Sequence, residues 1–307
     1  MSWVAAGRAP AFTRGRHRVR LAVGQSVNLA RIAKPRIVAL FALTVLAATM
    51  LAGPVGPALT VAIVASSALT VGGAAALNNY LERGLDARMA RTRRRPTAAG
   101  TVTPRAALAF GLLATAAGVA AVWACGGAVA AGFAAAGAVY YVVVYTLLIK
   151  PHTALSSLPG GLAGIFPALI GWTAAGGGLT GRIVFVCALI AVWSPPHFWA
   201  LAFARQDDYL ASGVPTPPLA LGEAAAARMI LAAAAVLVCL PVLAVVTGLY
   251  GPTYLIVAVP AGAAFLTLAA LLARRRRRAT AWLLFKVSGP YLAALLVAMV
   301  VERLARP

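Results

Sequence analysis

Long apolar segments alternate with short polar connections along most of the chain. Nine of these segments approach the ~20 residues that a helix needs to cross the hydrocarbon core of a bilayer. They cover roughly residues 37–53, 57–79, 106–125, 127–149, 155–175, 183–204, 226–248, 253–273 and 282–301. The pattern therefore predicts an all-α integral membrane protein with nine transmembrane helices.

Composition supports this prediction. Of the 307 residues, 62% are hydrophobic and 11% are charged, too few polar groups to cover a water-soluble fold. The net charge of +21 would favour nucleic acid in a soluble protein, but a nucleic-acid partner does not explain the apolar segments, and we expect none. The three cysteines all lie inside apolar segments, which argues against a disulfide framework or a thiolate metal site.

Basic residues orient the predicted helices. With the N-terminus in the cytoplasm, 24 of the 27 Lys and Arg residues fall on the cytoplasmic side, as the positive-inside rule requires. The Arg-rich N-terminal region lacks a continuous apolar core, so we expect no cleavable signal peptide. We predict a disordered cytoplasmic arm over residues 1–30 and a single transmembrane domain over residues 31–307.

Four of the six acidic residues lie in two clusters at the cytoplasmic ends of predicted helices. Asn78, Glu82 and Asp86 are spaced i, i+4 and i+8, so they share one stripe of a continuing helix. Asp207 and Asp208 form a second cluster after the helix over residues 183–204. Carboxylates near membrane depth are costly unless they are paired or bind a cation.

Oxygen ligands without a nearby Cys or His cluster favour Mg²⁺, which is held by one or two carboxylates together with substrate phosphates. A diphosphate is the natural third component of such a site. The surrounding basic residues that could neutralise it are Arg83, Arg88, Arg91, Arg93, Lys150 and Arg205. The alternative is that the acids pair with neighbouring arginines as solvated loop residues. For Arg274 to Arg278 we favour a topology anchor that contacts anionic lipids.

At these positions the chain resembles the intramembrane prenyltransferase superfamily (UbiA type) and, within it, the haem O synthases, or protohaem IX farnesyltransferases. Asn78, Glu82 and Asp86 match the Asn-x-x-x-Asp-x-x-x-Asp motif of the superfamily, with Glu replacing the middle Asp. Further matching segments are Lys34-Pro35-Arg36, Arg91-Thr92, Arg95-Pro96, Tyr145-Thr146 with Lys150, and WSPPHFWALAFARQDDY over residues 193–209. Two departures are Pro151, where the family usually has Arg, and Ser156, where Asn is common.

The resemblance implies a helical bundle around a central cavity in the plasma membrane, with the active site towards the cytoplasm. It implies transfer of a farnesyl group from farnesyl diphosphate to a vinyl group of haem B, with water addition, giving haem O. Mg²⁺ would be the cofactor, and haem A synthase a possible partner. Carried onto this sequence, the metal ligands are Asn78, Glu82, Asp86, Asp207 and Asp208. The substrate-binding residues are Arg88, Lys150, Arg205, Tyr145, Tyr209 and His197.

His197 has two interpretations. It could ligate haem iron or contact a haem propionate, or it could be a hydrogen-bonded core histidine. Other functions also stay open: a related prenyltransferase that acts on a quinone or chlorin precursor, or a haem carrier without catalytic activity. A transporter is disfavoured because it would need charges within the helix centres, whereas these acids cluster at one membrane face.

Overall fold

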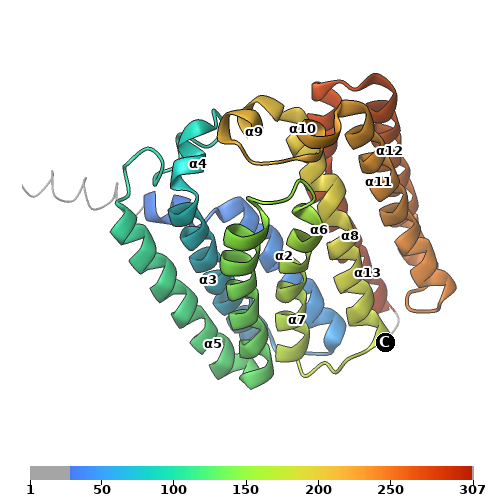
Figure 1. Ribbon diagram of the computed structural model, residues 1–307. Coiled ribbons are helices and arrows are strands. Elements are labelled where there is room, and N and C mark those ends of the chain that lie inside the picture. The colour runs from blue at the N-terminus through green and yellow to red at the C-terminus, as the bar shows by residue number, and fades with distance from the viewer. Residues whose placement is uncertain (1–27, 306–307) are drawn as a thin grey trace, which may run out of the picture.

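Every regular element in the computed structural model, which describes residues 28–305, is a helix. The predicted Arg-rich arm lies outside the described residues except for residues 28–30, which are helical. The elements, drawn in Figure 1, are α2 (Pro35–Ala52), α3 (Pro57–Leu81), α4 (Arg83–Arg88), α5 (Pro104–Val139), η1 (Tyr140–Ile149), α6 (Ser157–Ala163), α7 (Ile165–Ala174), α8 (Gly181–Ala204), α9 (Gln206–Ser212), α10 (Pro217–Leu221), α11 (Glu223–Val246), α12 (Thr253–Arg275) and α13 (Arg278–Ala305).

Seven helices of the described chain are long and apolar enough to cross a membrane. Three of them begin with Pro35, Pro57 or Pro104, because a proline at the first helical position lacks only an N–H that would have no partner there. The all-α class is confirmed, whereas the count of nine crossings stays a prediction. The difference lies in two places: α5 and η1 together form one 46-residue span, and α6 and α7 are short helices.

Glycines let the helices of the bundle approach closely. A Cβ on Gly118 of α5 would lie 2.5 Å from the backbone N of Thr70 in α3. On α7, a Cβ on Gly171 would lie 2.3 Å from the backbone O of Val45 in α2. Close backbone approach through small residues is a common way for membrane helices to associate. These contacts bring α2, α3, α5 and α7 together around the space described below.

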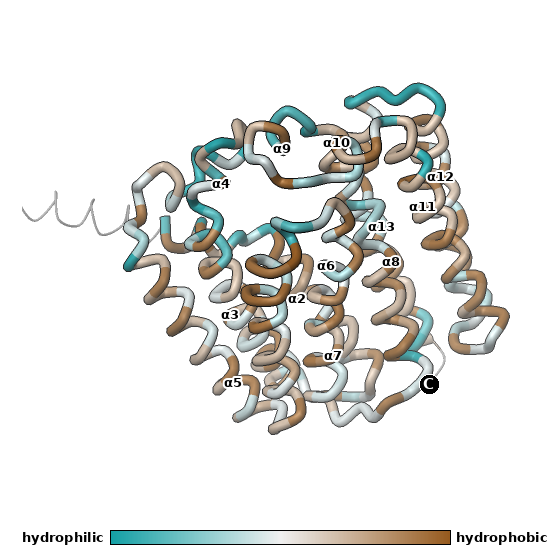
Figure 2. The backbone as a smooth tube through the Cα atoms, in the orientation of Figure 1, coloured by the Kyte–Doolittle hydropathy of each residue, from teal (hydrophilic) through white to brown (hydrophobic). Residues whose placement is uncertain are grey.

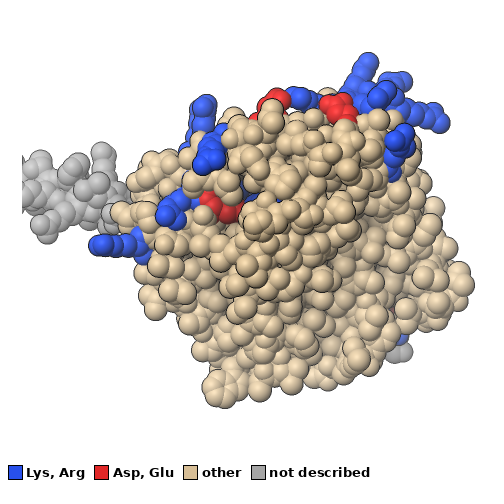
Figure 3. Space-filling model, viewed as in Figure 1, with Lys and Arg blue, Asp and Glu red and all other residues tan. Residues whose placement is uncertain are grey.

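Polar residues gather at one end of the bundle. Figure 2 shows hydrophilic residues around α4, α9 and the turn between α12 and α13, while the residues of the long helices are mainly apolar. On the face in Figure 3, most Lys, Arg, Asp and Glu side chains lie at this same end. The short helices α4 and α9 contact each other across this end. The segments that follow α3 and α8 therefore meet above the bundle.

Candidate active site

The stripe Asn78, Glu82 and Asp86 lies where α3 passes into α4. Although α3 ends at Leu81, Glu82 N donates to Asn78 O at 2.9 Å, and Asp86 N donates to Glu82 O at 2.8 Å. These bonds continue the helical path, so the three side chains stay on one face, as their spacing predicts. They are only 1%, 6% and 3% exposed, respectively, and all three line a cavity inside the bundle.

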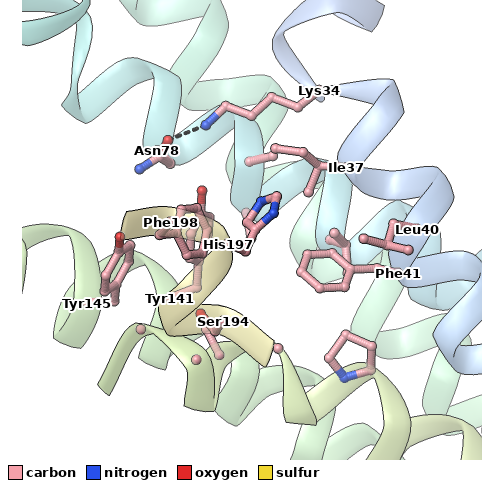
Figure 4. Close-up of a pocket in the computed structure, with 18 of the residues that line it drawn as sticks. Lys34, Ile37, Leu40, Phe41, Asn78, Tyr141, Tyr145, Ser194, His197 and Phe198 are labelled. Atoms are coloured by element: carbon pink, nitrogen blue, oxygen red, sulfur yellow. Dashed lines mark hydrogen bonds between the residues drawn. The ribbon is translucent and has the colours of Figure 1, made fainter. Parts of the chain in front are cut away.

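Each member of the stripe contacts a cation from another part of the chain. Lys34, just before α2, donates a hydrogen bond to Asn78 Oδ1, which is the dashed contact in Figure 4. Lys150, just after η1, forms an ion pair with Glu82. Arg95 Nη1 lies 2.9 Å from Asp86 Oδ1 and 2.8 Å from Oδ2. The stripe is thus tied to three separate segments.

Burial and neighbouring charges shift the pKa values of three groups around the stripe. Burial alone would raise the pKa of Glu82, but Lys150 and Lys34 hold it below its usual range. Burial would likewise lower the pKa of Lys150, but Glu82 raises it instead. Lys34 differs, because burial, reinforced by the positive charge of Arg95, lowers its pKa to about 7. An anion bound among these cations would relieve their repulsion.

The π-helix η1 places Lys150 on the cavity side. The Lys150 N–H donates to Tyr145 O, the i to i−5 pattern of a π-helix, and the Thr146 hydroxyl also donates five residues back, to Tyr141 O. In an α-helix, the nine residues from Tyr141 to Lys150 would make about two and a half turns and put the two side chains on opposite faces. In η1, Tyr141, Tyr145 and Lys150 all line the cavity.

The cavity has a volume of about 450 Å³ and extends from this charged end into the apolar bundle. Five basic residues and two acidic residues line it, all contributed by segments at the ends of helices. Further down, its walls are mostly aliphatic and aromatic side chains from α2, α3, α5, α7, α8 and α13. A molecule with a charged head and an apolar body matches this division.

His197 of α8 lines the cavity within an aromatic cluster. Its ring stacks on Trp193 with the centroids 4.4 Å apart, and it lies 4.6 Å from the ring of Phe285. Ser288 Oγ donates to Phe285 O at 2.6 Å, so its only hydrogen is used and His197 Nδ1 is the donor to Ser288 Oγ. That tautomer carries its lone pair on Nε2, where a metal or a hydrogen-bond donor can bind.

The second acidic cluster divides between two environments. Asp208 is 8% exposed, and its Oδ1 accepts a hydrogen bond from Ala90 N at 2.7 Å. Neither acid lines the cavity, although Tyr209 beside Asp208 does. Asp207 is exposed and forms an ion pair with Arg278 at 2.7 Å on the surface. We therefore leave Asp207 out of the metal site proposed below.

The remaining predicted substrate residues also differ in position. Tyr145 and Tyr209 line the cavity, as Lys150 and His197 do. Arg88 and Arg205 are exposed and lie outside its lining, and Arg205 stacks on Trp282, with its guanidinium carbon 4.5 Å from the ring centroid. Both arginines nevertheless flank the charged end, at the end of α4 and the start of α9.

Sequence reasoning missed Lys34, Arg95 and Ser288 as site residues. Lys34 and Arg95 belong to segments that resemble the prenyltransferases, and this resemblance could have marked them as site residues. It does not show their contacts, because Asn78 lies 44 residues from Lys34 and Asp86 lies 9 residues from Arg95. Ser288 is 91 residues from His197, and no local pattern connects the two. The Lys34 contact depends on the packing of α2 against α3, and the Ser288 contact depends on the packing of α13 against α8.

The sequence matches the UbiA prenyltransferase family over residues 39–296. The chain belongs to this family. Among its relatives in the family, the protoheme IX farnesyltransferase of Thermus thermophilus is 39% identical over 274 residues, which are 89% of this chain and 45% of that protein. The protoheme IX farnesyltransferase of Marinobacter nauticus is 38% identical over 274 residues, 88% of this chain and 90% of that protein. The chain thus spans about half the length of the first relative and most of the second.

Solved structures of UbiA homologs share the fold. One from Aeropyrum pernix K1 has a TM-score of 0.67 at 20% identity, covering 87% of this chain and 96% of that one. One from Archaeoglobus fulgidus, bound to DMAPP and Mg²⁺, has a TM-score of 0.63 at 13% identity, covering 88% and 99%. The resemblance to intramembrane prenyltransferases is therefore confirmed at the level of sequence family and helical fold.

Proposed function

We propose that this protein transfers a farnesyl group from farnesyl diphosphate to a vinyl group of haem B, with water addition, to give haem O. The names of its relatives in the UbiA family support haem and a farnesyl donor as substrates. The observation that carries the proposal is the stripe of Asn78, Glu82 and Asp86, which lines an apolar cavity while each member contacts a cation.

The residues present fit a site for Mg²⁺ and diphosphate. Two buried carboxylates and an amide oxygen on one helical face are hard oxygen ligands, and Mg²⁺ completes such a set with water and substrate phosphates. When bound there, Mg²⁺ would neutralise charge that develops on the departing diphosphate. The solved UbiA homolog from Archaeoglobus fulgidus that is bound to DMAPP and Mg²⁺ supports this assignment. We propose Asn78, Glu82, Asp86 and Asp208 as the ligands or the acceptors of metal-bound water.

The cations of the site would change partners when substrate binds. Lys150 and Arg95 now pair with the two carboxylates of the stripe, Lys34 donates to its amide, and all three groups lie at the cavity surface beside it. Once the carboxylates face a metal ion, these cations are available to the phosphate oxygens. We propose Lys150 as the main diphosphate contact from the sequence prediction, and we add Lys34 and Arg95. Arg88 and Arg205 would guide the anion from the rim.

His197 is proposed to contact haem B. Its Nδ1 is fixed by Ser288, so Nε2 keeps a lone pair that could bind iron, and Trp193 and Phe285 offer flat apolar surfaces to a porphyrin. Tyr145 and Tyr209 lie in the cavity wall near the charged end and would help to close the site over the reacting groups.

The chain's own groups account for the reaction as follows. Cations bind the diphosphate as the allylic C–O bond breaks and the electron pair leaves with oxygen. The vinyl carbon forms the new C–C bond with the farnesyl carbon, and water adds to the resulting cation with loss of a proton. The apolar walls keep water away from the farnesyl cation before the vinyl group attacks.

We also propose nine crossings with a cytoplasmic N-terminus in the plasma membrane. Gly127 has φ 80°, which interrupts α5 and divides the 46-residue span Pro104–Ile149 into two lengths that could each cross. The segment α6–α7 would be the next crossing. The basic end of the bundle would face the cytoplasm and anionic lipid, with haem A synthase as a candidate recipient of the product.

The decisive experiment supplies the purified full chain with haem B, farnesyl diphosphate and Mg²⁺ and identifies the haem product by mass. We expect the mass of haem B plus one farnesyl group and one hydroxyl group, together with release of diphosphate, and neither in excess EDTA. Asp86→Ala should insert into membranes without turnover. Prenylation of a quinone or chlorin precursor but not haem would favour the related prenyltransferase, and haem binding without diphosphate release would favour a carrier.

A further inference from the structure

The cavity extends well below the charged stripe, beyond the space that a metal ion and a diphosphate would occupy. The residues at successive i−4 positions below Asn78 on α3, Ala74 and Thr70, also line it. The stripe therefore continues from the proposed diphosphate site into the apolar bundle along one face of α3. A prenyl chain attached to that diphosphate would follow this face.

The lower end of the cavity is formed by Thr44 of α2, Ala134 of α5 and Ile170 of α7. The last two belong to one buried cluster and are 1% and 2% exposed. Behind them, Val122 and Ala130 are fully buried, so the packed interior begins there. We call Ala134 and Ile170 the floor of the cavity.

The depth of this end suits a chain of several isoprene units. Lys34 marks the charged end and Thr44 the lower end of the same helix, and ten residues of α-helix rise about 15 Å. That is of the same order as an extended chain of three isoprene units. The cavity side by α8 is shallower, because Ile190, the lowest α8 residue that lines the cavity, lies beside Gly164 just before α7, six residues above Ile170 along that helix.

The chemistry of the lower end favours hydrocarbon over a porphyrin. The Thr44 hydroxyl donates to Leu40 O at 3.0 Å and the Thr70 hydroxyl donates to Ser66 O at 3.1 Å, so both are used by their own helices. Ala74, Gly137 and Ala134 leave a passage lined by small groups. A narrow apolar end without free polar partners suits a flexible prenyl tail and offers nothing to haem propionates.

We infer that Ala134 and Ile170 set the longest prenyl chain that this protein accepts, by closing the cavity below the third isoprene unit. This inference rests on the proposed function, because it assigns the tail of the same diphosphate substrate. A side chain that fills or empties the floor should then change chain-length preference in opposite directions, since one methylene in an apolar pocket changes selectivity by about 10- to 200-fold.

The test compares geranyl, farnesyl and geranylgeranyl diphosphates with haem B, Mg²⁺ and the full chain, and reads product masses and kcat/KM. Ala134→Leu should lower the farnesyl-to-geranyl ratio by about tenfold or more. Ile170→Ala should raise the geranylgeranyl-to-farnesyl ratio by a similar factor. Ile190→Ala is the matched control, because it removes the same atoms from the shallower side and should leave both ratios within about twofold, whatever its effect on rate.

A binding measurement separates this inference from the proposed reaction. Displacement of labelled farnesyl diphosphate by the other two diphosphates needs no haem, and the floor variants should shift relative affinities in the same directions. If the wild-type chain yields no prenylated haem but the floor variants shift the relative affinities, the proposed reaction is wrong and the inference about the floor holds. If neither floor variant changes a ratio, or if Ile190→Ala changes it most, the inference is overturned.

Discussion

Asp208 Oδ1 accepts a hydrogen bond from the backbone N of Ala90 at 2.7 Å. The two residues are 118 positions apart, yet this bond ties the segment after α4 to the start of α9 above the cavity. It joins the two acid-bearing segments directly. Asp208 therefore positions one segment on the other in addition to any contact it makes with Mg²⁺ or its waters.

This hydrogen bond and the proposed metal contact of Asp208 give a first prediction about the neighbouring acids. Asp208→Asn keeps an oxygen that can accept from Ala90 N but removes the negative charge, so we expect stable protein with turnover reduced at least about 100-fold and a higher Mg²⁺ requirement. Asp207→Asn is the matched control, since Asp207 is exposed and its ion pair with Arg278 lies on the surface. It should retain turnover within about twofold.

Turnover and thermal stability of both variants should be measured over a range of Mg²⁺ concentrations. If Asp208→Asn turns over normally, its carboxylate is a structural acceptor and takes no part in metal binding. If Asp207→Asn is the more damaging change, the second acidic cluster has been assigned the wrong residue.

The Glu82–Lys150 ion pair gives a second prediction. Removing one partner leaves a buried charge unpaired, so Glu82→Gln and Lys150→Met should each lower stability by about 1–3 kcal/mol, and the double variant should recover much of that loss. Activity should not recover, because the double variant lacks both a carboxylate for metal and a cation for diphosphate. Lys150→Met alone should also raise the KM for farnesyl diphosphate about tenfold or more.

Thermal unfolding in detergent and steady-state kinetics of the four proteins form one double-mutant cycle. Recovery of both stability and turnover in the double variant would show that the pair is only structural. Glu82 would then fit the alternative stated for the sequence, in which the acids pair with neighbouring basic residues and have no catalytic role.

The sequence could predict the helices and the acid stripe because both follow from local spacing. Asn78, Glu82 and Asp86 recur every four residues, and hydrogen bonds through Glu82 preserve this register even though α3 ends there. Asp207 and Asp208 show the limit of local spacing. Both acids stand at the start of α9, and only the packing of that helix shows that one faces Ala90 and the other faces Arg278.

The π-helical register of η1 could not be predicted. Hydrophobic periodicity over residues 127–149 indicates a membrane helix, but it does not show that Lys150 will turn towards Glu82 through i to i−5 bonds. The contact of Lys34 with Asn78 likewise depends on the packing of α2 against α3. Long-range partners of buried charges follow from tertiary packing, which composition and spacing do not contain.

The His197–Ser288 hydrogen bond gives a third prediction. His197→Phe keeps a ring between Trp193 and Phe285 but removes both nitrogens, so we expect the fold to persist and haem B affinity to fall about tenfold or more, with an altered haem absorption spectrum. Ser288→Ala removes the partner that fixes the tautomer and should cause a smaller loss. Haem titration monitored by absorption measures both effects.

His152→Ala is the control for this titration, since His152 is exposed in the turn after Lys150. Unchanged haem affinity and spectrum in His197→Phe would make His197 a hydrogen-bonded core histidine, the second of its two interpretations. A larger effect in His152→Ala would place haem at the charged rim instead.

Close packing of α7 on α2 gives the last prediction. A Cβ on Gly171 would lie 2.3 Å from Val45 O and 3.0 Å from Thr49 Oγ1. The Thr49 hydroxyl lies between the two helices, 2.9 Å from Val45 O and 3.2 Å from Gly171 O. Gly171→Ala must push the two helices apart, which should cost about 1–3 kcal/mol of stability, whereas Gly132→Ala, with open space around it, should be neutral or slightly stabilising. Because α2 and α7 supply Thr44 and Ile170 at the lower end of the cavity, the Gly171 variant should also lose farnesyl diphosphate affinity before it unfolds. Thermal inactivation in detergent measures the change in stability, and farnesyl diphosphate binding below the unfolding temperature measures the change in affinity. If Gly171→Ala and Gly132→Ala have the same stability and the same affinity, the contact between α7 and α2 is less close than in the structure.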